Sequence, residues 1–223
     1  MVRTGPGPLG AGGLIVSGAP GTITAMGASA RTPSRDIEAA LIDAAERVLV
    51  RDGPEAVTVR AVAAEAGVAP MGVYNRFGGK DGLVDELLSR GFSGLRDAIA
   101  PHGETDPVQR LAECGRRYRE FALAHPAHYV AMFDDAIHQE ATSPAVEQLA
   151  LATFDELVGH VQYAMVGGVL AQADPVRVAQ QIWSCVHGAV QLEIKGMLQV
   201  PDAQQAYTEL IATLFRGLQV PQE

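Results

Sequence analysis

The chain has 223 residues, of which 48% are hydrophobic, and this is enough to bury a full core in one domain or in two. Its net charge is −9, but residues 1–80 carry 8 Lys and Arg against 7 Asp and Glu, a net of +1, whereas residues 81–223 carry 9 against 19, a net of −10. These values exclude a strongly basic coat for nonspecific nucleic-acid binding, so an anionic partner has to be held by a few placed contacts.

Residues 1–30 contain eight glycines and three prolines without any hydrophobic period, and we predict a disordered tail there. The N-terminus lacks a secretory signal, and the longest uncharged apolar stretch, Tyr163 to Ala171, is far shorter than the ~20 residues that span a bilayer. We therefore expect a cytoplasmic protein without a membrane partner. In that compartment Cys114 and Cys185 are expected to be buried free thiols.

A first helix is predicted from Ser34 to the stop signal at Gly53 and Pro54. Ser34 is a suitable N-cap, and Asp36 in the first turn interacts favourably with the helix dipole. Apolar residues recur at helical spacing at Ile37, Ala40, Leu41, Ala44, Ala45, Val48 and Leu49. This stripe is expected to face a core.

The stretch from Thr58 to Leu83 has the pattern of two short helices joined by a tight turn and followed by a third. Thr58 is a suitable N-cap for the first, and Gly67 permits the left-handed position that ends it. Pro70 suits the first turn of the second helix, which we place at about Pro70 to Arg76. An apolar face follows from Val59, Val62, Ala63 and Ala66 in one helix and from Val73 and Phe77 in the next. A short helix displayed on such a scaffold is typical of helix-turn-helix proteins that read the major groove of DNA.

The run GVAPMGVYNRF from Gly67 to Phe77, followed by Lys80 and Leu83, resembles the DNA-binding domain of the TetR family of bacterial regulators. The similarity covers about Ser34 to Leu88. Three positions depart from the family pattern: Ala69 stands where a capping Ser is usual, Gly72 replaces a frequent Thr or Ser, and Arg76 a frequent His or Tyr. These departures affect the expected operator sequence and leave the expected fold unchanged.

The predicted DNA-binding residues divide into two groups. Geometry and the resemblance together predict phosphate contacts for Thr58, Tyr74 and Lys80, which set the register of the protein on DNA without reading its sequence. The candidates for contacts with base edges are Arg60, Met71, Gly72, Asn75 and Arg76. Arg suits guanine, Asn suits adenine and Met a thymine methyl, whereas Gly72 only permits close approach. The alternative, an ordinary solvated helix face, agrees less well with the helix-start and turn signals.

The remainder of the chain has only helical patterns. We expect helices at Pro107 to Ala124, through Tyr129 to Phe133, from Ser143 to about Leu170, from Asp174 to about Lys195, and from Asp202 to Leu218. The helix from about Lys80 to Ala98 connects the two halves and is expected to be the only link between them. The predicted class is all-α, with a helix-turn-helix domain at residues 31–80 and a helical ligand-binding and dimerisation domain at residues 81–223.

The last two helices carry apolar stripes, at Ile182, Cys185, Val186 and Ala189 and at Tyr207, Leu210, Ile211, Leu214 and Leu218. These stripes can close the core of the protomer, or they can pair two chains. The TetR resemblance implies the second, a homodimer joined by a four-helix bundle, and two-fold dimers are the commonest oligomers. Two segments, IWSCVHGAVQLE from Ile182 to Glu193 and HPAHY from His125 to Tyr129, further resemble a W-x-x-x-H-G class of TetR C-terminal domains.

A set of bulky residues is either core or the lining of a cavity for a small hydrophobic effector, and the sequence leaves both open. The set comprises Tyr118, Phe121, Tyr129, Met132, Phe133, Phe154, Met165, Trp183 and His187. Of these, His187 is expected to be a hydrogen-bonded core residue or a polar group of the pocket. No metal site is predicted at His125 and His128, since Pro126 interrupts the helical register between them.

The sequence shows no nucleophile motif, phosphate-binding loop or cofactor motif, so no catalytic residue and no cofactor is predicted. The resulting hypothesis is a transcriptional regulator that binds double-stranded DNA at a palindromic operator as a dimer and is released by a small hydrophobic effector. The alternatives are a helical ligand carrier or enzyme that has kept a helix-turn-helix domain, and an interaction protein that does not bind DNA.

Overall fold

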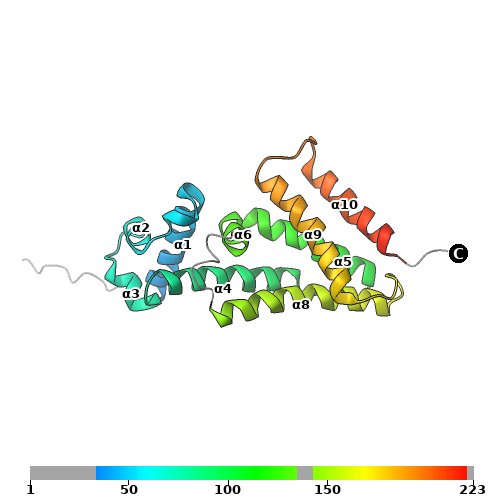
Figure 1. Ribbon diagram of the computed structural model, residues 1–223, viewed down its shortest axis with the longest axis horizontal. Coiled ribbons are helices and arrows are strands. Elements are labelled where there is room, and N and C mark those ends of the chain that lie inside the picture. The colour runs from blue at the N-terminus through cyan, green and yellow to red at the C-terminus, as the bar shows by residue number, and fades with distance from the viewer. Residues whose placement is uncertain (1–33, 135–142, 220–223) are drawn as a thin grey trace, which may run out of the picture. The chain divides into compact units, whose positions relative to one another are not determined.

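The computed structural model describes residues 34–134 and 143–219 (Figure 1). The helices are α1 (Ser34–Asp52), α2 (Val59–Glu65), α3 (Met71–Phe77), α4 (Lys80–Ile99), α5 (Pro107–Ala124), α6 (Pro126–Phe133), α8 (Pro144–Val166), α9 (Pro175–Ile194) and α10 (Ala203–Leu218), with a short 3-10 helix at Pro54–Ala56. The described ranges contain no strand, only an isolated bridge between Leu170 and Gln219. The all-α class is confirmed, whereas the predicted tail at residues 1–30 lies outside the described residues.

Side-chain caps begin most of the long helices. Asp106 accepts a hydrogen bond of 2.7 Å from the amide of Gln109, Ser143 one of 3.4 Å from Val146, and Asp174 one of 3.0 Å from Val176. A proline follows each cap at the first helical position, where its missing N–H costs nothing. The helix starts predicted at Ser143 and Asp174 are therefore confirmed.

A glycine with positive φ follows each of the helices α2 and α8. The position at which α8 ends differs from the predicted one. Gly67 has φ +68°, and Val68 donates from its amide to the Ala63 carbonyl at 2.9 Å. Gly168 has φ +71°, and Val169 donates to the Ala164 carbonyl at 3.0 Å. Both satisfy carbonyls that the last turn leaves unpaired. The helix predicted to reach Leu170 thus ends at Val166, because the glycine pair closes it.

Helix α4 is central to the packing, and Figure 1 shows it running beside α8. It also contacts α1 and α3 of the N-terminal part and α5 and α6 of the C-terminal part. Its residues Leu83, Leu87 and Leu88 are completely or almost completely buried. The described residues all belong to one compact unit, so a domain boundary near residue 80 stays a prediction.

Candidate functional site

The helix-turn-helix is built by local hydrogen bonds that the residue types dictate. The Thr58 hydroxyl accepts a bond of 3.2 Å from the Ala61 amide and caps α2. Gly67 then turns the chain into α3, which has no side-chain cap at its N-terminus, in keeping with Ala69 in place of a capping residue. Val73 is fully buried and holds the short α3 on the core. The outer side of α3 is thereby turned to solvent.

The eight predicted DNA-contact residues come from the start of α2, from α3 and from the start of α4. Met71 is 63% exposed and Tyr74 is 51% exposed. The other exposed members are Thr58, Arg60 and Asn75, and the half-buried members are Gly72, Arg76 and Lys80. The Arg76 guanidinium donates to the Gly72 carbonyl at 3.4 Å. The chain's own packing does not demand glycine at position 72, since a Cβ there would meet Val68 at an ordinary 3.7 Å.

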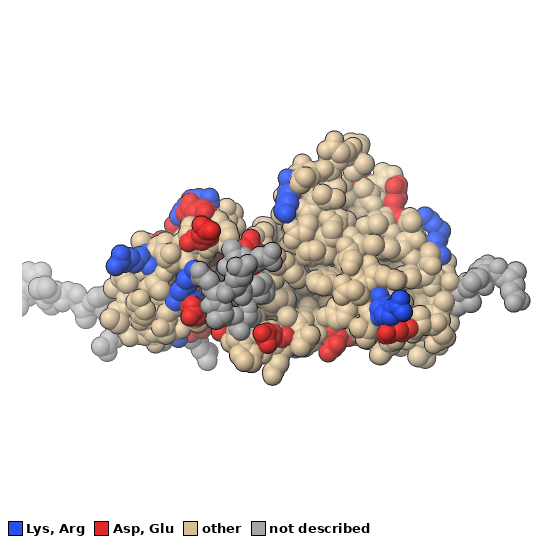
Figure 2. All heavy atoms as spheres, in the orientation of Figure 1, with Lys and Arg blue, Asp and Glu red and all other residues tan. Residues whose placement is uncertain are grey.

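Acidic and basic side chains are interspersed around this helix-turn-helix. Arg47 and Arg51 of α1 bind Glu65 of α2, at 2.8 Å and 2.9 Å. The hydrogen bond from Arg47 contributes most to holding the pKa of Glu65 below its usual value. Figure 2 shows blue and red side chains next to one another at this end of the described chain. The face seen in Figure 2 therefore carries separate basic side chains and no continuous basic patch among the described residues.

Helix α4 presses directly on the end of α3. Gly78 has φ +73°, and its amide donates to the Tyr74 carbonyl at 3.0 Å, which closes α3. A little further along the chain, a Cβ added at Gly82 would lie only 1.9 Å from the backbone oxygen of Phe77. Only glycine allows this approach, so the first turn of α4 and the last turn of α3 are in backbone contact.

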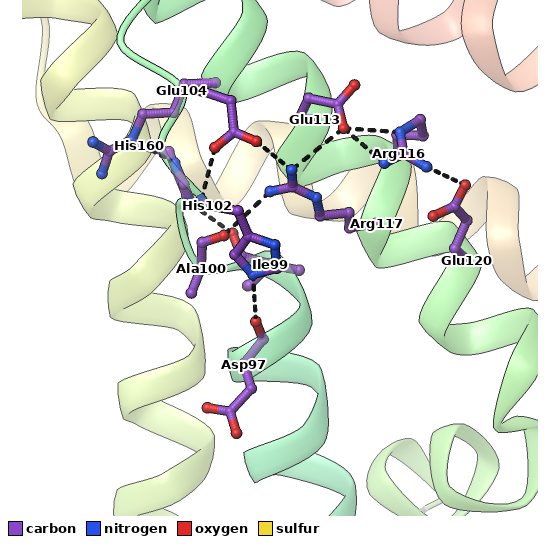
Figure 3. A network of polar contacts seen from close by, with 11 residues as sticks. Asp97, Ile99, Ala100, His102, Glu104, Glu113, Arg116, Arg117, Glu120 and His160 are labelled. Carbon is purple, nitrogen blue, oxygen red and sulfur yellow. Dashed lines mark hydrogen bonds and ion pairs between the residues drawn. The ribbon is translucent and has the colours of Figure 1, made fainter.

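The other end of α4 is anchored by a polar network (Figure 3). His160 of α8 lies with its Nε2 2.8 Å from the Ile99 carbonyl, and Arg110 donates to its Nδ1 at 3.0 Å. Arginine has no acceptor, so Nδ1 must accept and Nε2 must carry the proton that Ile99 receives. Burial is the main reason why the pKa of His160 is lowered.

A second group in the same network holds the loop after α4. Arg117 of α5 donates to the Ala100 carbonyl at 3.3 Å and forms an ion pair with Glu104 (Figure 3). The hydrogen bond from Arg117 is the largest cause that lowers the pKa of Glu104 to about 2. Carbonyls that would otherwise be unpaired at the end of α4 are thus bound by side chains of α5 and α8.

An apolar cavity of about 390 Å³ lies between α4, α5, α6, α8, α9 and α10. The residues that line it are Phe92, Leu95, Ile99, Leu111, Cys114, Gly115, Tyr118, Met132, Phe133, Ala150, Thr153, Phe154, Leu157, Ile182, Trp183, Val186, Ile211, Leu214 and Phe215. This volume is within the range of sites for small molecules. No charged side chain of the described residues lines the cavity.

Five of the nine predicted pocket residues line this cavity: Tyr118, Met132, Phe133, Phe154 and Trp183. The structure places Phe121 and Met165 elsewhere in the core, where both are buried. Tyr129 and His187 lie behind Tyr118 and are hydrogen-bonded to it at 3.0 Å each. Of the two alternatives left open by the sequence, these four residues therefore take the place of core residues beside this cavity, because bulk and aromatic character do not tell which face of a helix borders it.

The polar group behind the cavity is a triangle of three atoms. The hydroxyls of Tyr118 and Tyr129 and the Nδ1 of His187 lie 2.8–3.0 Å apart, and the Trp183 indole donates to the Tyr118 hydroxyl at 3.2 Å. Burial raises the pKa of Tyr118 to about 12 and is the main cause that lowers the pKa of His187. His187 is therefore a hydrogen-bonded residue of the core, as one of the two interpretations predicted.

Sequence reasoning missed most of the apolar lining. Ile182 and Val186 of α9 and Ile211 and Leu214 of α10 were placed on stripes for dimerisation, but they border the cavity of their own protomer. The helical period identified these stripes correctly. It held no signal for what lies opposite them.

Three further findings concern metal ligands, membrane-spanning helices and cysteines in the described part of the chain. In the described part of the chain, no three His, Cys, Asp or Glu side chains come together as a metal would require. No helix in the same ranges is long and apolar enough to cross a membrane. Cys114 and Cys185 are free thiols, the first buried and the second half-buried.

A helix-turn-helix on a helical domain with an apolar cavity defines the class of one-component DNA-binding regulators. Residues 41–87 match the family model of bacterial regulatory proteins of the tetR family, and residues 111–214 match that of the tetracyclin repressor-like C-terminal domain. The chain belongs to the TetR family of DNA-binding transcriptional regulators. Neither match identifies the signature from Trp183 to Gly188, so the subfamily stays a prediction.

Relatives and solved structures agree with this assignment. An uncharacterized HTH-type transcriptional regulator of Mycobacterium tuberculosis is 24% identical over 206 residues, which cover 86% of this chain and 85% of the relative. A solved protein of unknown function from a Rhodococcus species is 28% identical with a TM-score of 0.72, covering 82% of this chain and 96% of that one. The fold is also that of the TetR family regulator PfmR from Thermus thermophilus, with a TM-score of 0.66, 17% identity, and coverage of 81% and 99%.

Proposed function

We propose that this regulator is a repressor, which binds a palindromic operator as a homodimer and is released when a small hydrophobic effector enters the cavity. One observation carries the proposal. Helix α4 touches the end of α3 through Gly82, and it also supplies Phe92, Leu95 and Ile99 to the cavity wall. A ligand that displaces α4 therefore acts on the helix that is proposed to read DNA.

In the proposed complex, Thr58, Tyr74 and Lys80 contact phosphates, and the base edges meet Arg60, Met71, Gly72, Asn75 and Arg76. The exposure of Met71 and Tyr74 supports this arrangement, because both side chains can contact a partner without a change in the core of the protomer. Two recognition helices of a dimer have to lie about one turn of DNA apart, ~34 Å, to enter successive major grooves.

The proposed transmission has two routes from the cavity. The expectation that α4 is the only link is wrong, since α6 also packs on α1. Met132 and Phe133 of α6 line the cavity, and His128 of the same helix faces Glu46 of α1. Anchoring of the C-terminal end of α4 by His160 and Arg117 favours movement of its N-terminal end. An effector can shift the spacing only by its differential affinity, typically about 1–3 kcal/mol of coupling.

Selection of bound sites from random duplexes tests the proposed DNA activity. We expect a palindrome whose half-site centres lie about 10 base pairs apart. Recovery of a single half-site, or of no sequence preference, contradicts the proposal. A screen for small molecules that weaken this binding then tests release by an effector.

Sedimentation at micromolar concentration tests the dimer. Leu210 is half-buried in the described chain and does not line the cavity, so Leu210→Glu is expected to weaken a dimer without filling the cavity. The matched control is Leu151→Glu on α8, where the side chain is 65% exposed. A monomeric wild-type protein, or equal effects of both substitutions, contradicts the proposed interface.

A further inference from the structure

We propose that the cavity selects an uncharged, largely apolar ligand that carries a hydrogen-bond donor, such as a hydroxyl or an N–H group, and that Tyr118 accepts this hydrogen bond. The inference rests on the proposed function of the cavity as an effector site and adds the chemical class of the effector. It follows from an inventory of the hydrogen atoms that the lining can still donate.

Among the described residues, the lining contains four side chains with a hydroxyl, indole N–H or thiol group: Cys114, Tyr118, Thr153 and Trp183. Burial raises the pKa of the Cys114 thiol to about 12, so this group is neutral at physiological pH. A carboxylate or phosphate in the cavity would lose its hydration without gaining a positive partner from the described lining. The described lining therefore disfavours an anionic group.

Thr153 has no hydrogen to offer a ligand. Its hydroxyl lies 2.8 Å from the Leu149 carbonyl and 3.2 Å from the Phe92 carbonyl. Carbonyl oxygens only accept, so the single hydroxyl proton is shared between them or taken by one. What remains on Thr153 is acceptor capacity.

Trp183 also has no hydrogen left to offer a ligand. It has one N–H group and no acceptor. That group donates to the Tyr118 hydroxyl at 3.2 Å. A ligand can recruit it only by breaking this bond. Among the strong donors of the described lining, the hydroxyl of Tyr118 therefore remains to be considered.

The hydroxyl proton of Tyr118 is also used in a hydrogen bond within the protein, according to the following assignment. The shortest contact of the triangle, 2.8 Å, joins Tyr129 to the Nδ1 of His187, and we assign the Tyr129 proton to it. Tyr118 then donates to the Tyr129 oxygen at 3.0 Å. With the proton on Nδ1 instead, one buried hydroxyl would lack an acceptor, which is unfavourable. In this arrangement Tyr118 keeps one lone pair, because the other receives the Trp183 N–H, and the proposal places this lone pair toward the cavity that Tyr118 lines.

Every polar lining group that remains available, except the weakly donating thiol of Cys114, therefore presents an acceptor. A phenol or an alcohol can donate a hydrogen bond to Tyr118. An ether, ester or ketone of the same shape cannot donate one and can be bound only through its apolar surface. The difference expected for one hydrogen bond in a buried site is about tenfold in Kd.

Three matched series of ligands test this inference on the full chain. The para-alkylphenols from methyl to octyl provide the donor, the corresponding para-alkylanisoles lack it, and the para-alkylbenzoates carry a charge. Trp183 is the only tryptophan of the chain and borders the cavity, so its fluorescence reports occupancy directly, and calorimetry provides Kd. We expect the best phenol to bind about tenfold more tightly than its methyl ether and the benzoates not to bind.

Tyr118→Phe removes the proposed acceptor and is expected to make phenol and ether bind with equal affinity. The matched control is Tyr207→Phe, since Tyr207 is also buried and donates to the Gly115 carbonyl at 2.7 Å but does not line the cavity. This control should keep the tenfold preference for the phenol. Melting curves verify that both variants are folded, and the wild-type ratio tests the inference even where a variant fails to fold.

The outcomes separate this inference from the proposed function. Equal Kd values for phenol and ether in the wild type, or tight binding of a benzoate, overturn the preference for a donor while the cavity remains a ligand site. Absence of binding in all three series overturns the inference and weakens the proposal of an effector site. The selection of an operator from random duplexes stands apart from all of these results.

Discussion

His128 of α6 places its Nε2 atom 3.1 Å from the Oε1 of Glu46 in α1. The two helices belong to opposite ends of the proposed transmission, because α6 borders the cavity and α1 supports the helix-turn-helix. The angles at this contact are not those of a hydrogen bond, and Nε2 has no hydrogen-bond partner among the described residues. Burial is the main cause that raises the pKa of Glu46 and that lowers the pKa of His128. Both shifts favour the uncharged forms.

A double-mutant cycle of Glu46→Gln and His128→Gln is expected to give a coupling of about 0.5–1 kcal/mol in the free energy of unfolding. The reason is that Nε2 and Oε1 lie 3.1 Å apart with both side chains largely removed from solvent, so each substitution changes the surroundings of the other residue. The control cycle uses Arg116 and Glu120, an i,i+4 pair on α5 with about half of each side chain exposed, where we expect at most about 0.5 kcal/mol. A coupling at the first pair no larger than at the second would show that α1 and α6 are held by apolar packing alone.

The stability of the protein is expected to fall when the pH is lowered below about 6.5, the usual pKa of histidine. The folded-state pKa of His160 is depressed, so the unfolded chain binds more protons in this range and acidification favours unfolding. The depressed pKa values of His128 and His187 act in the same direction, and the raised pKa of Glu46 opposes them.

Urea unfolding at a series of pH values measures this dependence. His160→Gln should reduce the slope, and at neutral pH it should cost about 1–3 kcal/mol, because buried partners of the imidazole lose a hydrogen bond. His102→Gln, at an exposed position of the neighbouring loop, is the control for removal of a histidine. A slope in His160→Gln equal to that of the wild type contradicts the assignment.

Alanine at Gly82 is expected to destabilise the protein by at least about 2 kcal/mol, because its Cβ would lie 1.9 Å from the Phe77 oxygen and the backbone has to shift. The same substitution at Gly159 of α8 meets no atom within 4 Å and should stabilise by about 0.5–1 kcal/mol, since alanine is the better helix former. Unfolding midpoints in urea compare the two. Similar destabilisation by both variants would refute a specific contact between α3 and α4.

Lys80→Ala should weaken binding to all DNA sequences alike and lower the slope of log K against log salt by about one unit, as loss of one phosphate contact does. Asn75→Ala should relax the preference at particular base pairs, by about 1–3 kcal/mol. Binding titrations at several salt concentrations and on substituted operators distinguish the two effects. The reverse pattern would exchange the roles assigned to the two residues.

The helix boundaries were predictable where one or two residues determine them. The caps Asp106, Ser143 and Asp174 are each followed by proline, and the structure begins a helix at each of these positions. The end of α8 was misplaced at Leu170, because the apolar pattern continues past Gly167 and Gly168 although the backbone turns there. A hydrophobic period does not report the sign of φ at a glycine.

The sequence by itself determined the helix-turn-helix, because its cap, its glycine turn and its short apolar faces all act within about 25 residues of chain. Only the tertiary structure decided the cavity. Thr153, Cys114 and Leu214 meet there from three helices, and nothing in the period of any one helix states which neighbour it will face. Ile211 and Leu214 lie on a stripe that was expected to join two chains, and the packing places them in the wall of the cavity within one chain. Local signals determine local geometry, whereas a cavity is formed by residues that are distant in sequence.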